Sequence, residues 1–350
     1  MPAETMPAAV YVGDGELECR DVPVPVPRPG EALVEVSHCG ICGTDLHLVL
    51  ERYARPGTIL GHEWAGTVVQ VDGVDGANGG RAPTPGTHVV ADTTRGCGTC
   101  RACRRGRPSV CLEREPPDLL EFRGAFTRYV TVPVARLLPL PDGLSTRAAA
   151  LTEPTAIALH TVELSGVGPD DRVLITGAGP VGLLTLAVLR ARGIDDVTVS
   201  EPFAARRDRA REVGAARVVA PDELPRPPMG RPVAAPFTIA FECSGNAAAG
   251  EAALDQLDYA GTLVFVGTGH DMPRVNHNRM IVMELTAIGA YNYGAEGFGP
   301  AVTLLASGRM PLDLLIEPVD VGLEGVADAI RRLAAGELPG KVMVRPGDGS

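Results

Sequence analysis

A glycine-rich turn that follows a short apolar run constrains the fold of this chain more than any other feature. The run at 171–176 (DRVLIT) has the length and composition of a buried strand, and G-A-G-P-V-G follows it directly. Gly177 permits a tight turn, Gly179 lets the backbone approach a pyrophosphate, and Gly182 lets the next helix pack closely on the strand. The pattern therefore predicts a strand–turn–helix unit that binds a dinucleotide, with an ordinary turn of another doubly wound protein as the alternative.

Strand and helix patterns alternate on the C-terminal side of this turn. Helical stretches are predicted at 183–192, 205–213 and 247–258, separated by short apolar runs. These runs are at 197–200, 217–220, 238–242, 263–266 and 287–290. Strands that alternate with helices predict a doubly wound parallel sheet, so the fold class is α/β.

The rest of the chain differs in character and suggests a second domain, as a length of 350 residues allows. Residues 1–145 are β-rich, with apolar runs at 32–36, 66–71, 88–91 and 129–132. Ser145 can cap a helix that runs toward residue 164, and helices are expected around 300–307 and 325–335. The final run, 341–344, is predicted to pair back with the first domain. We therefore expect one domain from 1–145 and 295–350, and a dinucleotide domain from 146–294.

Four of the eight cysteines fall within fifteen positions, as C-x2-C-x2-C-x7-C. These are Cys97, Cys100, Cys103 and Cys111. The first residues, MPAETMPAAV, do not form a secretory signal, and no apolar run is long enough to span a bilayer. We therefore expect a cytoplasmic, reducing environment, in which clustered cysteines hold metal rather than form disulfides. Four thiolates fit structural zinc or an iron–sulfur cluster, and they leave no open coordination position.

The net charge of −11 argues against general affinity for nucleic acid or anionic membranes. Arginines at 95, 101, 104, 105 and 107 surround the cysteine cluster. They either offset its negative charge or, as the alternative, form a nucleic-acid patch. Lys341 is the only lysine, so any lysine-based mechanism would have to use it.

A second set of soft and hard donors lies nearer the N-terminus. Cys42 begins C-G-T-D-L-H, and His62 and Glu63 belong to G-H-E-W. Each residue alone is compatible with a packing or structural role. Together with a nucleotide domain and a first metal site, however, these sulfur, nitrogen and oxygen donors indicate a second metal.

An acidic residue follows the glycine motif at the end of the next predicted strand. Glu201 lies 19 residues after Gly182, where a carboxylate can bind both ribose hydroxyls and repel a 2′-phosphate. This favours NAD over NADP. Arg206 and Arg207 leave NADP open, because a nearby guanidinium could hold that phosphate.

Over essentially its whole length the chain resembles the zinc-dependent medium-chain alcohol dehydrogenases. The matching motifs are C-G-T-D-x-H, G-H-E, the four cysteines, G-x-G-P-V-G with its downstream acid, and the closing G-K-V. The resemblance is strongest to the polyol (sorbitol-type) branch, because Glu153-Pro154 stands where classical alcohol dehydrogenases have a cysteine ligand, and F-E-C-S-G (241–245) is similar. It implies a GroES-like β-rich catalytic domain joined to a Rossmann domain.

The resemblance also implies roles for individual residues. Cys42 and His62 would bind a catalytic zinc, with Glu63 and Glu153 completing the shell or holding it through water, while Asp45 orients His62. Thr44 and His47 stand at the proton-relay positions. Two zinc ions per chain are expected. The dinucleotide would bind at Gly177, Gly179, Pro180, Val181, Gly182, Glu201, Arg206 and Val266.

The function that this resemblance implies is oxidation of a secondary alcohol of a polyol, sugar or cyclitol to a ketone, with NAD. Asn292 departs from the arginine that polyol enzymes often have in Y-N-Y (291–293), which argues against a simple sorbitol-like substrate. The alternatives are an NADPH-dependent carbonyl reductase and a non-catalytic zinc and nucleotide sensor. No nucleic-acid or membrane partner is expected, and analogy suggests a homodimer or homotetramer.

Overall fold

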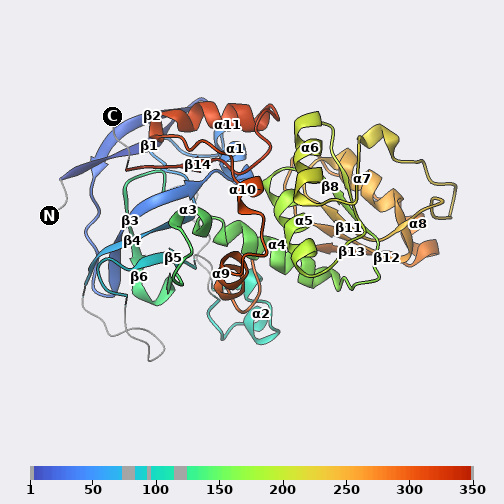
Figure 1. The fold of residues 1–350 in the computed structure, drawn as a ribbon, viewed down its shortest axis with the longest axis horizontal. Coiled ribbons are helices and arrows are strands. Elements are labelled where there is room, and N and C mark those ends of the chain that lie inside the picture. Colours follow the sequence, from blue (N-terminus) through green and yellow to red (C-terminus); the bar gives the residue numbers. More distant parts are fainter. Residues whose placement is uncertain (1–3, 73–82, 93–95, 114–123, 348–350) are drawn as a thin grey trace.

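The computed structural model describes residues 4–72, 83–92, 96–113 and 124–347, which form two lobes side by side (Figure 1). One lobe contains an antiparallel sheet with the order β14-β3-β4-β5-β7, and β6 pairs with β3. Its strands are β3 (Glu31–Gly40), β4 (Glu63–Val71), β5 (His88–Ala91), β6 (Tyr129–Pro133), β7 (Leu137–Pro139) and β14 (Met343–Val344). A hairpin of β1 (Thr5–Gly13) and β2 (Glu16–Pro23) lies beside it, with helices α1 (Gly43–Leu50), α2 (Arg101–Arg104) and α11 (Val326–Ala334).

The other lobe is a parallel sheet of six strands in the order β10-β9-β8-β11-β12-β13. Its strands are β8 (Val173–Thr176), β9 (Val197–Ser200), β10 (Arg217–Val219), β11 (Phe237–Glu242), β12 (Leu257–Phe265) and β13 (Thr286–Gly289). The helices are α5 (Pro180–Ala191), α6 (Ala204–Val213), α7 (Ala247–Asp255) and α8 (His277–Met283). The predicted doubly wound sheet is confirmed. Its order reverses between β8 and β11, where such sheets bind ligands.

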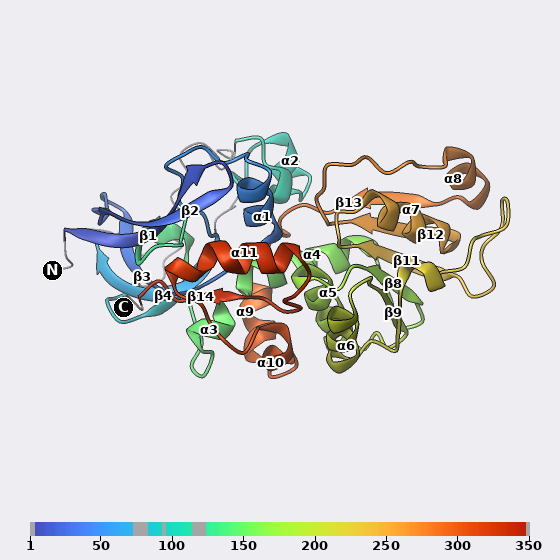
Figure 2. The ribbon, with the colours of Figure 1, turned by 90° about the horizontal axis from the view of Figure 1, so that it is seen from above.

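Both ends of the chain contribute to the antiparallel lobe. Strand β14 pairs antiparallel with β3, and helix α11 contacts α1 (Figure 2). Both termini lie at the end of the molecule farthest from the parallel sheet (Figure 1). Helices α4 (Thr152–Ser165), α9 (Gly299–Ala306) and α10 (Leu312–Leu315) lie where the lobes meet, and α4 packs on α5 and α9. A single apolar cluster continues from α4 into the strands of the parallel sheet, so the lobes share part of their core.

Two predicted elements differ from the structure. The helix expected from Ser145 to about 164 is broken into α3 (Thr146–Ala149) and α4. Pro154 explains the break, because its ring would clash with the carbonyl of residue 150 in a continuous helix. The helix expected over 247–258 ends at Asp255, and β12 begins at Leu257, earlier than the predicted run. The pairing of β12 with β11 has a register shift near this early start, so the first residues of β12 do not continue the regular run that the sequence pattern predicts.

Candidate active site and metal centres

The glycine turn has the geometry that a pyrophosphate requires. Gly177 has a φ of +96°, and a Cβ there would lie 2.8 Å from the Cβ of Ser244, in the loop after β11. A Cβ on Gly182 would collide with the Gly177 carbonyl oxygen. A Cβ on Gly179 would instead meet no atom within 4 Å, so this residue faces the space that a phosphate group would fill. Pro180 then opens α5, whose N-terminus points its N–H groups toward that space.

Glu201 is buried and already organises the turn. One of its carboxylate oxygens accepts a hydrogen bond from Ala178 N at 2.7 Å, and the other accepts one from Phe203 N at 3.0 Å. Each oxygen keeps a lone pair that a ribose hydroxyl could use. Arg206 is near this carboxylate, but its guanidinium donates to the Leu333 carbonyl oxygen at 2.9 Å. Burial lowers the pKa of Arg206 against the opposing effect of Glu201.

The loop after β12 is held beside the end of β11. Val266 N and Gly267 N both donate to the Glu242 carbonyl oxygen at 2.9 Å. Gly245 and Gly269 pack backbone against backbone, since a Cβ on either would collide with the other loop. Val266 therefore lies at the carboxyl end of the sheet, on the same edge as the glycine turn.

The four clustered cysteines form one compact thiol group on the antiparallel lobe. The Sγ–Sγ distance is 4.0 Å for Cys97 and Cys103, and 3.9 Å for Cys100 and Cys111; all four sulfurs lie within 4.8 Å of one another. A tetrahedron with Zn–S bonds of about 2.3 Å requires sulfurs about 3.8 Å apart. The donor set therefore fits zinc with little rearrangement.

Backbone N–H groups of the cysteine lobe (residues 96–112) stabilise negative charge on the sulfurs. Hydrogen bonds from Cys103 N and Leu112 N lower the pKa of Cys100 to about 6. Burial raises the pKa of Cys103 to about 12, and its hydrogen bonds with the other three cysteines add to this rise. One contact joins the lobe to the other domain: Asn292 Nδ2 donates to the Ser109 carbonyl oxygen at 3.2 Å. Asn292 is thus occupied in a structural contact.

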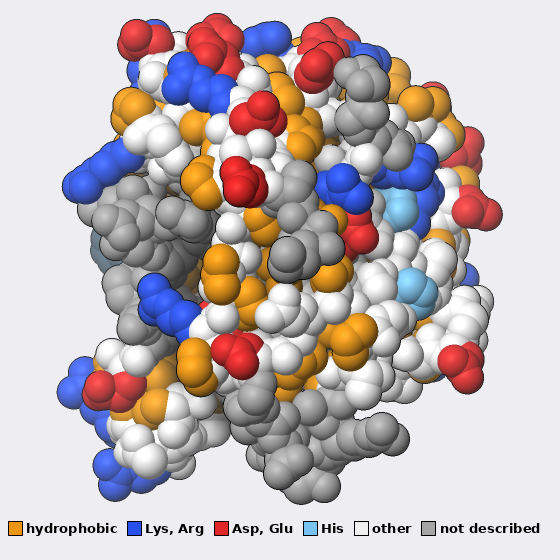
Figure 3. Space-filling model, turned by 90° about the vertical axis from the view of Figure 1, so that its left-hand side faces the viewer, with side chains coloured by type: hydrophobic (Ala, Val, Ile, Leu, Met, Phe, Trp, Pro, Cys, Tyr) orange, Lys and Arg blue, Asp and Glu red, His pale blue; other side chains and the backbone are white. Residues whose placement is uncertain are grey.

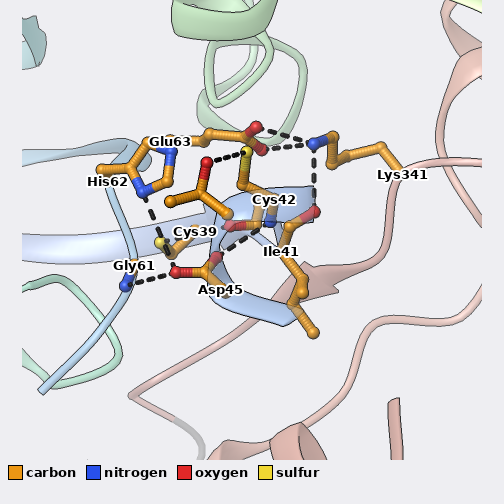
Figure 4. Close-up of polar contacts among 10 residues, drawn as sticks. Cys39, Ile41, Cys42, Asp45, Gly61, His62, Glu63 and Lys341 are labelled. Carbon is orange, nitrogen blue, oxygen red and sulfur yellow. Dashed lines mark hydrogen bonds and ion pairs between the residues drawn. The ribbon is translucent and has the colours of Figure 1, made fainter. Parts of the chain in front are cut away.

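The second metal centre brings together Cys42, His62 and Glu63. Cys42 is the N-cap of α1, and His62 and Glu63 lie at the start of β4. Their possible ligand atoms lie within 4.8 Å of one another, and Figure 4 shows the side chains turned toward a common point. Burial alone would lower the pKa of His62, but negative charge on Cys42, Asp45 and Glu153 raises it well above its usual value. The surroundings of His62 are therefore those of a cation site.

Lys341 is a functional residue that the sequence reasoning did not place at the site. Its Nζ lies 2.7 Å and 2.6 Å from the two oxygens of Glu63, and it donates to the Ile41 carbonyl oxygen at 3.0 Å (Figure 4). The Lys341 and Glu63 side chains are 1% and 0% exposed, so the ion pair is fully buried. Glu63 Oε2 accepts no well-aligned hydrogen bond, which leaves it a lone pair for a metal. Two sequence features could have indicated this role, because Lys341 is the only lysine and lies in the closing G-K-V.

Asp45 contacts both segments that carry the donor group. It is buried, accepts from Cys42 N at 2.9 Å and lies 3.8 Å from His62 Nδ1. Gly61 N donates to the same carboxylate at 3.4 Å. Asp45 thereby links the start of α1 to the segment just before β4.

Glu153 lies near the start of α4 and acts on the same metal centre, but it is not part of the mutually close group of donor atoms. Burial raises its pKa to about 7; the positive charge of His62 opposes this effect and the negative charge of Glu63 adds to it. The groups within 4.8 Å of one another include Glu63 and leave Glu153 out. Among the described residues, Glu63 is therefore the carboxylate that belongs to the mutually close donor group, while Glu153 acts on His62 through its charge.

Thr44 and His47 lie on successive parts of α1. Thr44 Oγ1 is 3.7 Å from Cys42 Sγ. His47 is partly exposed, lies 2.7 Å from Glu51 through Nδ1, and lies 3.2 Å from the Thr268 carbonyl oxygen through Nε2. Because Thr268 belongs to the loop after β12, His47 marks where the two domains meet.

The surface shows mixed charge. Figure 3 presents the end face of the antiparallel lobe, where acidic and basic side chains are interspersed. Three arginines of the cysteine lobe (101, 105 and 107) line a hollow of about 280 Å³ that none of the catalytic candidates borders. Within the described ranges no helix has the length and apolarity to cross a membrane.

Two known protein domains match separate parts of this chain. Residues 28–142 match the alcohol dehydrogenase GroES-like domain, and residues 180–307 match the zinc-binding dehydrogenase domain. An L-threonine 3-dehydrogenase of Pyrococcus horikoshii is 35% identical over 313 residues, which cover 85% of this chain and 86% of that protein.

Solved structures agree over nearly the full length. A zinc-binding dehydrogenase of Sinorhizobium meliloti, solved with NADP bound, has a TM-score of 0.84 and 30% identity, covering 98% of this chain and all of its own. A 2R,3R-butanediol dehydrogenase of Bacillus subtilis has a TM-score of 0.83 and 26% identity, covering 98% and 100%. With two metal-donor groups and a dinucleotide turn in place, the chain belongs to the zinc-dependent medium-chain dehydrogenases, enzymes that use NAD or NADP.

Proposed function

We propose that this dehydrogenase oxidises a secondary alcohol of a polyol, sugar or cyclitol to a ketone, with NAD as hydride acceptor. The observation that carries the proposal is the donor group of Cys42, His62 and Glu63, whose possible ligand atoms lie within 4.8 Å of one another. Zinc bound there supplies Lewis-acid polarisation of the substrate oxygen. Three protein donors leave a fourth position open, as catalytic zinc sites require.

The relatives support a secondary alcohol with a polar neighbour. L-threonine 3-dehydrogenase and 2R,3R-butanediol dehydrogenase are both named for compounds whose reacting hydroxyl is on an internal carbon beside an amino or hydroxyl group. Asn292 bonds to Ser109 in the cysteine lobe, so it is a poor candidate for holding a polyol hydroxyl. We therefore expect the polar neighbour of the substrate to be recognised elsewhere.

The chain's own contribution to the reaction is the proton path. Thr44 Oγ1, which lies beside Cys42 Sγ, can accept the proton that leaves the substrate hydroxyl while it gives up its own hydroxyl proton toward solvent. His47 is 34% exposed and can pass a proton to solvent. Water would receive the proton at the end of this path.

The preference for NAD follows from the surroundings of Glu201. This carboxylate lies at the end of β9, where it would repel a 2′-phosphate. Arg207 donates to the carbonyl oxygens of Glu201 and Pro202, and Arg206 donates to that of Leu333, so both guanidinium groups bind main chain. The ratio of kcat/KM for NAD to that for NADP should exceed one, and Glu201→Ala should reduce it. A ratio below one in the unmodified enzyme would contradict this assignment.

An NADPH-dependent carbonyl reductase is the second candidate. It is favoured by the Sinorhizobium meliloti relative, which was solved with NADP, and by the proximity of Arg206 to Glu201. Hydride transfer in both directions with both cofactors separates the two candidates. A clear excess of carbonyl reduction with NADPH would support the reductase.

The substrate class is tested with a panel of polyols, cyclitols and amino-cyclitols, together with L-threonine and 2,3-butanediol, each with NAD. We expect turnover of at least one compound that has a secondary hydroxyl beside a polar group. Turnover confined to primary alcohols would overturn the proposal. Failure of every compound with either cofactor, despite full zinc content, would favour the non-catalytic sensor.

The proposal includes a homodimer or homotetramer in the cytoplasm. Strand β13 is the last in its sheet, and Thr286 and Ala287 on it are exposed. Helix α8 beside it exposes Ile281 and Val282, which are 70% and 61% exposed. A second copy joined edge to edge would cover both. Light scattering that gives the mass of one chain would contradict this assembly.

A further inference from the structure

A third group of metal-type donors spans the boundary between the two domains. His47 and Glu51 are four residues apart, so they share one face of α1 and its C-cap. His270 reaches the same place from the loop after β12. The Glu51 carboxylate contacts His47 Nδ1 through one oxygen, at 2.7 Å, and His270 Nε2 through the other. The ligand atoms of the three residues lie within 4.8 Å of one another.

The site is anchored on both sides and open to solvent. His270 is 51% exposed, so an ion can reach it. The Tyr53 hydroxyl lies 3.1 Å from each ring nitrogen of His270, and the two rings pack 5.3 Å apart, which restrains the imidazole. On the other side His47 Nε2 contacts the Thr268 carbonyl oxygen.

The donor chemistry is that of a zinc-type ion. Burial raises the pKa of Glu51, but hydrogen bonds from His47 and His270 outweigh it and the net pKa is lowered. Glu51 is thus an anion between two imidazoles, the nitrogen and oxygen set that suits borderline divalent cations. The proposed alcohol oxidation uses only His47 of the three, so it leaves the convergence of Glu51 and His270 unexplained.

We propose that His47, Glu51 and His270 form a third metal site, which binds Zn²⁺ or a similar divalent ion and clips the two domains together. Two ligands come from the catalytic domain and one from the nucleotide domain, so the ion would oppose their separation. Occupancy would also inhibit turnover, a consequence that rests on the proton path proposed above, because a ligated His47 cannot pass on a proton.

The site is tested by titrating Zn²⁺ into enzyme that already contains its two zinc ions, with a chromophoric zinc indicator as competitor. We expect one further site per chain in the unmodified enzyme. His270→Asn should raise the midpoint for this third equivalent at least about tenfold, because one of three ligands is lost. His277→Asn is the matched control, an exposed histidine of the same domain, and should leave the midpoint unchanged.

Thermal unfolding gives a second readout that does not depend on activity. An ion that bridges the domains should raise Tm in the unmodified enzyme and in His277→Asn, and less so in His270→Asn. Absence of a third equivalent, or a third equivalent that His270→Asn binds equally well, would overturn the proposal. Both readouts are independent of the alcohol substrate, so their failure would leave the proposed dehydrogenase function standing.

Discussion

The two metal centres of this enzyme are built in opposite ways. The cysteine lobe takes its four donors from fifteen consecutive positions, and its N–H···S hydrogen bonds come from the same short segment. The proposed catalytic centre takes Cys42 from the start of α1 and His62 and Glu63 from the start of β4, with Lys341 contributed by the end of the chain. One site is local in sequence, and the other exists only when distant segments meet.

This difference implies that the cysteine lobe contributes to stability and the other centre to the reaction. A closed shell of four thiolates has no room for a substrate, so the lobe can only hold structure. The catalytic group contains a carboxylate whose charge is shared between a metal site and a buried lysine. Changes at the two centres should therefore produce distinguishable effects.

Cys42→Ser should have the largest effect. We expect kcat to fall by about a thousandfold or more, because the metal supplies several kcal/mol of transition-state stabilisation. NAD binding, measured by fluorescence quenching or calorimetry, should persist because the glycine turn is untouched. Cys19→Ser, which alters an exposed cysteine on β2, is the control. Retained turnover in Cys42→Ser would rule out the zinc mechanism.

Lys341→Met should destabilise the fold. Removing one partner of a buried ion pair leaves an uncompensated charge on Glu63, which costs about 3–5 kcal/mol. Urea unfolding should show this loss, with Lys341→Arg milder because it keeps the cation. The double variant Glu63→Gln/Lys341→Met should recover part of the stability. If it is no more stable than the single variant, the ion pair is not the cause.

Cys100→Ser tests the cysteine lobe, the other of the two metal centres. We expect zinc content to fall from two ions per chain to one, while kcat/KM for the remaining folded enzyme changes less than about tenfold, since the lobe holds structure. Atomic absorption and steady-state kinetics on the same preparation measure both. A loss of activity as severe as that of Cys42→Ser would mean that the two centres are not independent.

Asn292→Gly should have the smallest effect. It removes the hydrogen bond to the Ser109 carbonyl, which contributes about 0.5–1.5 kcal/mol. Glycine adopts the positive φ of 55° at this position without strain, so the loss reflects the hydrogen bond together with the greater backbone freedom of glycine in the unfolded chain. Tm should fall slightly and the substrate profile should stay the same. A changed profile would place Asn292 in substrate recognition after all.

The sequence was most informative where function depends on consecutive residues. The strand, turn and helix around Gly177–Gly182 and the spacing of the four cysteines both specify local geometry, and the doubly wound sheet followed from the alternation of strands and helices. It was less informative about interruptions. Pro154 breaks a helix whose pattern looked continuous, and β12 starts within a stretch that was expected to be helical.

The proposed catalytic centre could not be predicted completely from local sequence patterns. Cys42, His62 and Glu63 were recognisable by type and motif, but no periodicity relates them to Lys341, almost 300 positions away. The same holds for His270, which meets His47 and Glu51 only because the loop after β12 packs against the other domain.

The sequence by itself therefore determined the donor types, the nucleotide turn and the closed cysteine shell, because hydrogen bonding and chain geometry over a few residues decide them. Three features required the packed domains: that Glu63 is grouped with Cys42 and His62, that the single lysine pairs with Glu63, and that two histidines from different domains share Glu51. Those outcomes depend on burial and charge–charge distances between segments remote in sequence. Such energies arise only once the two domains have packed together.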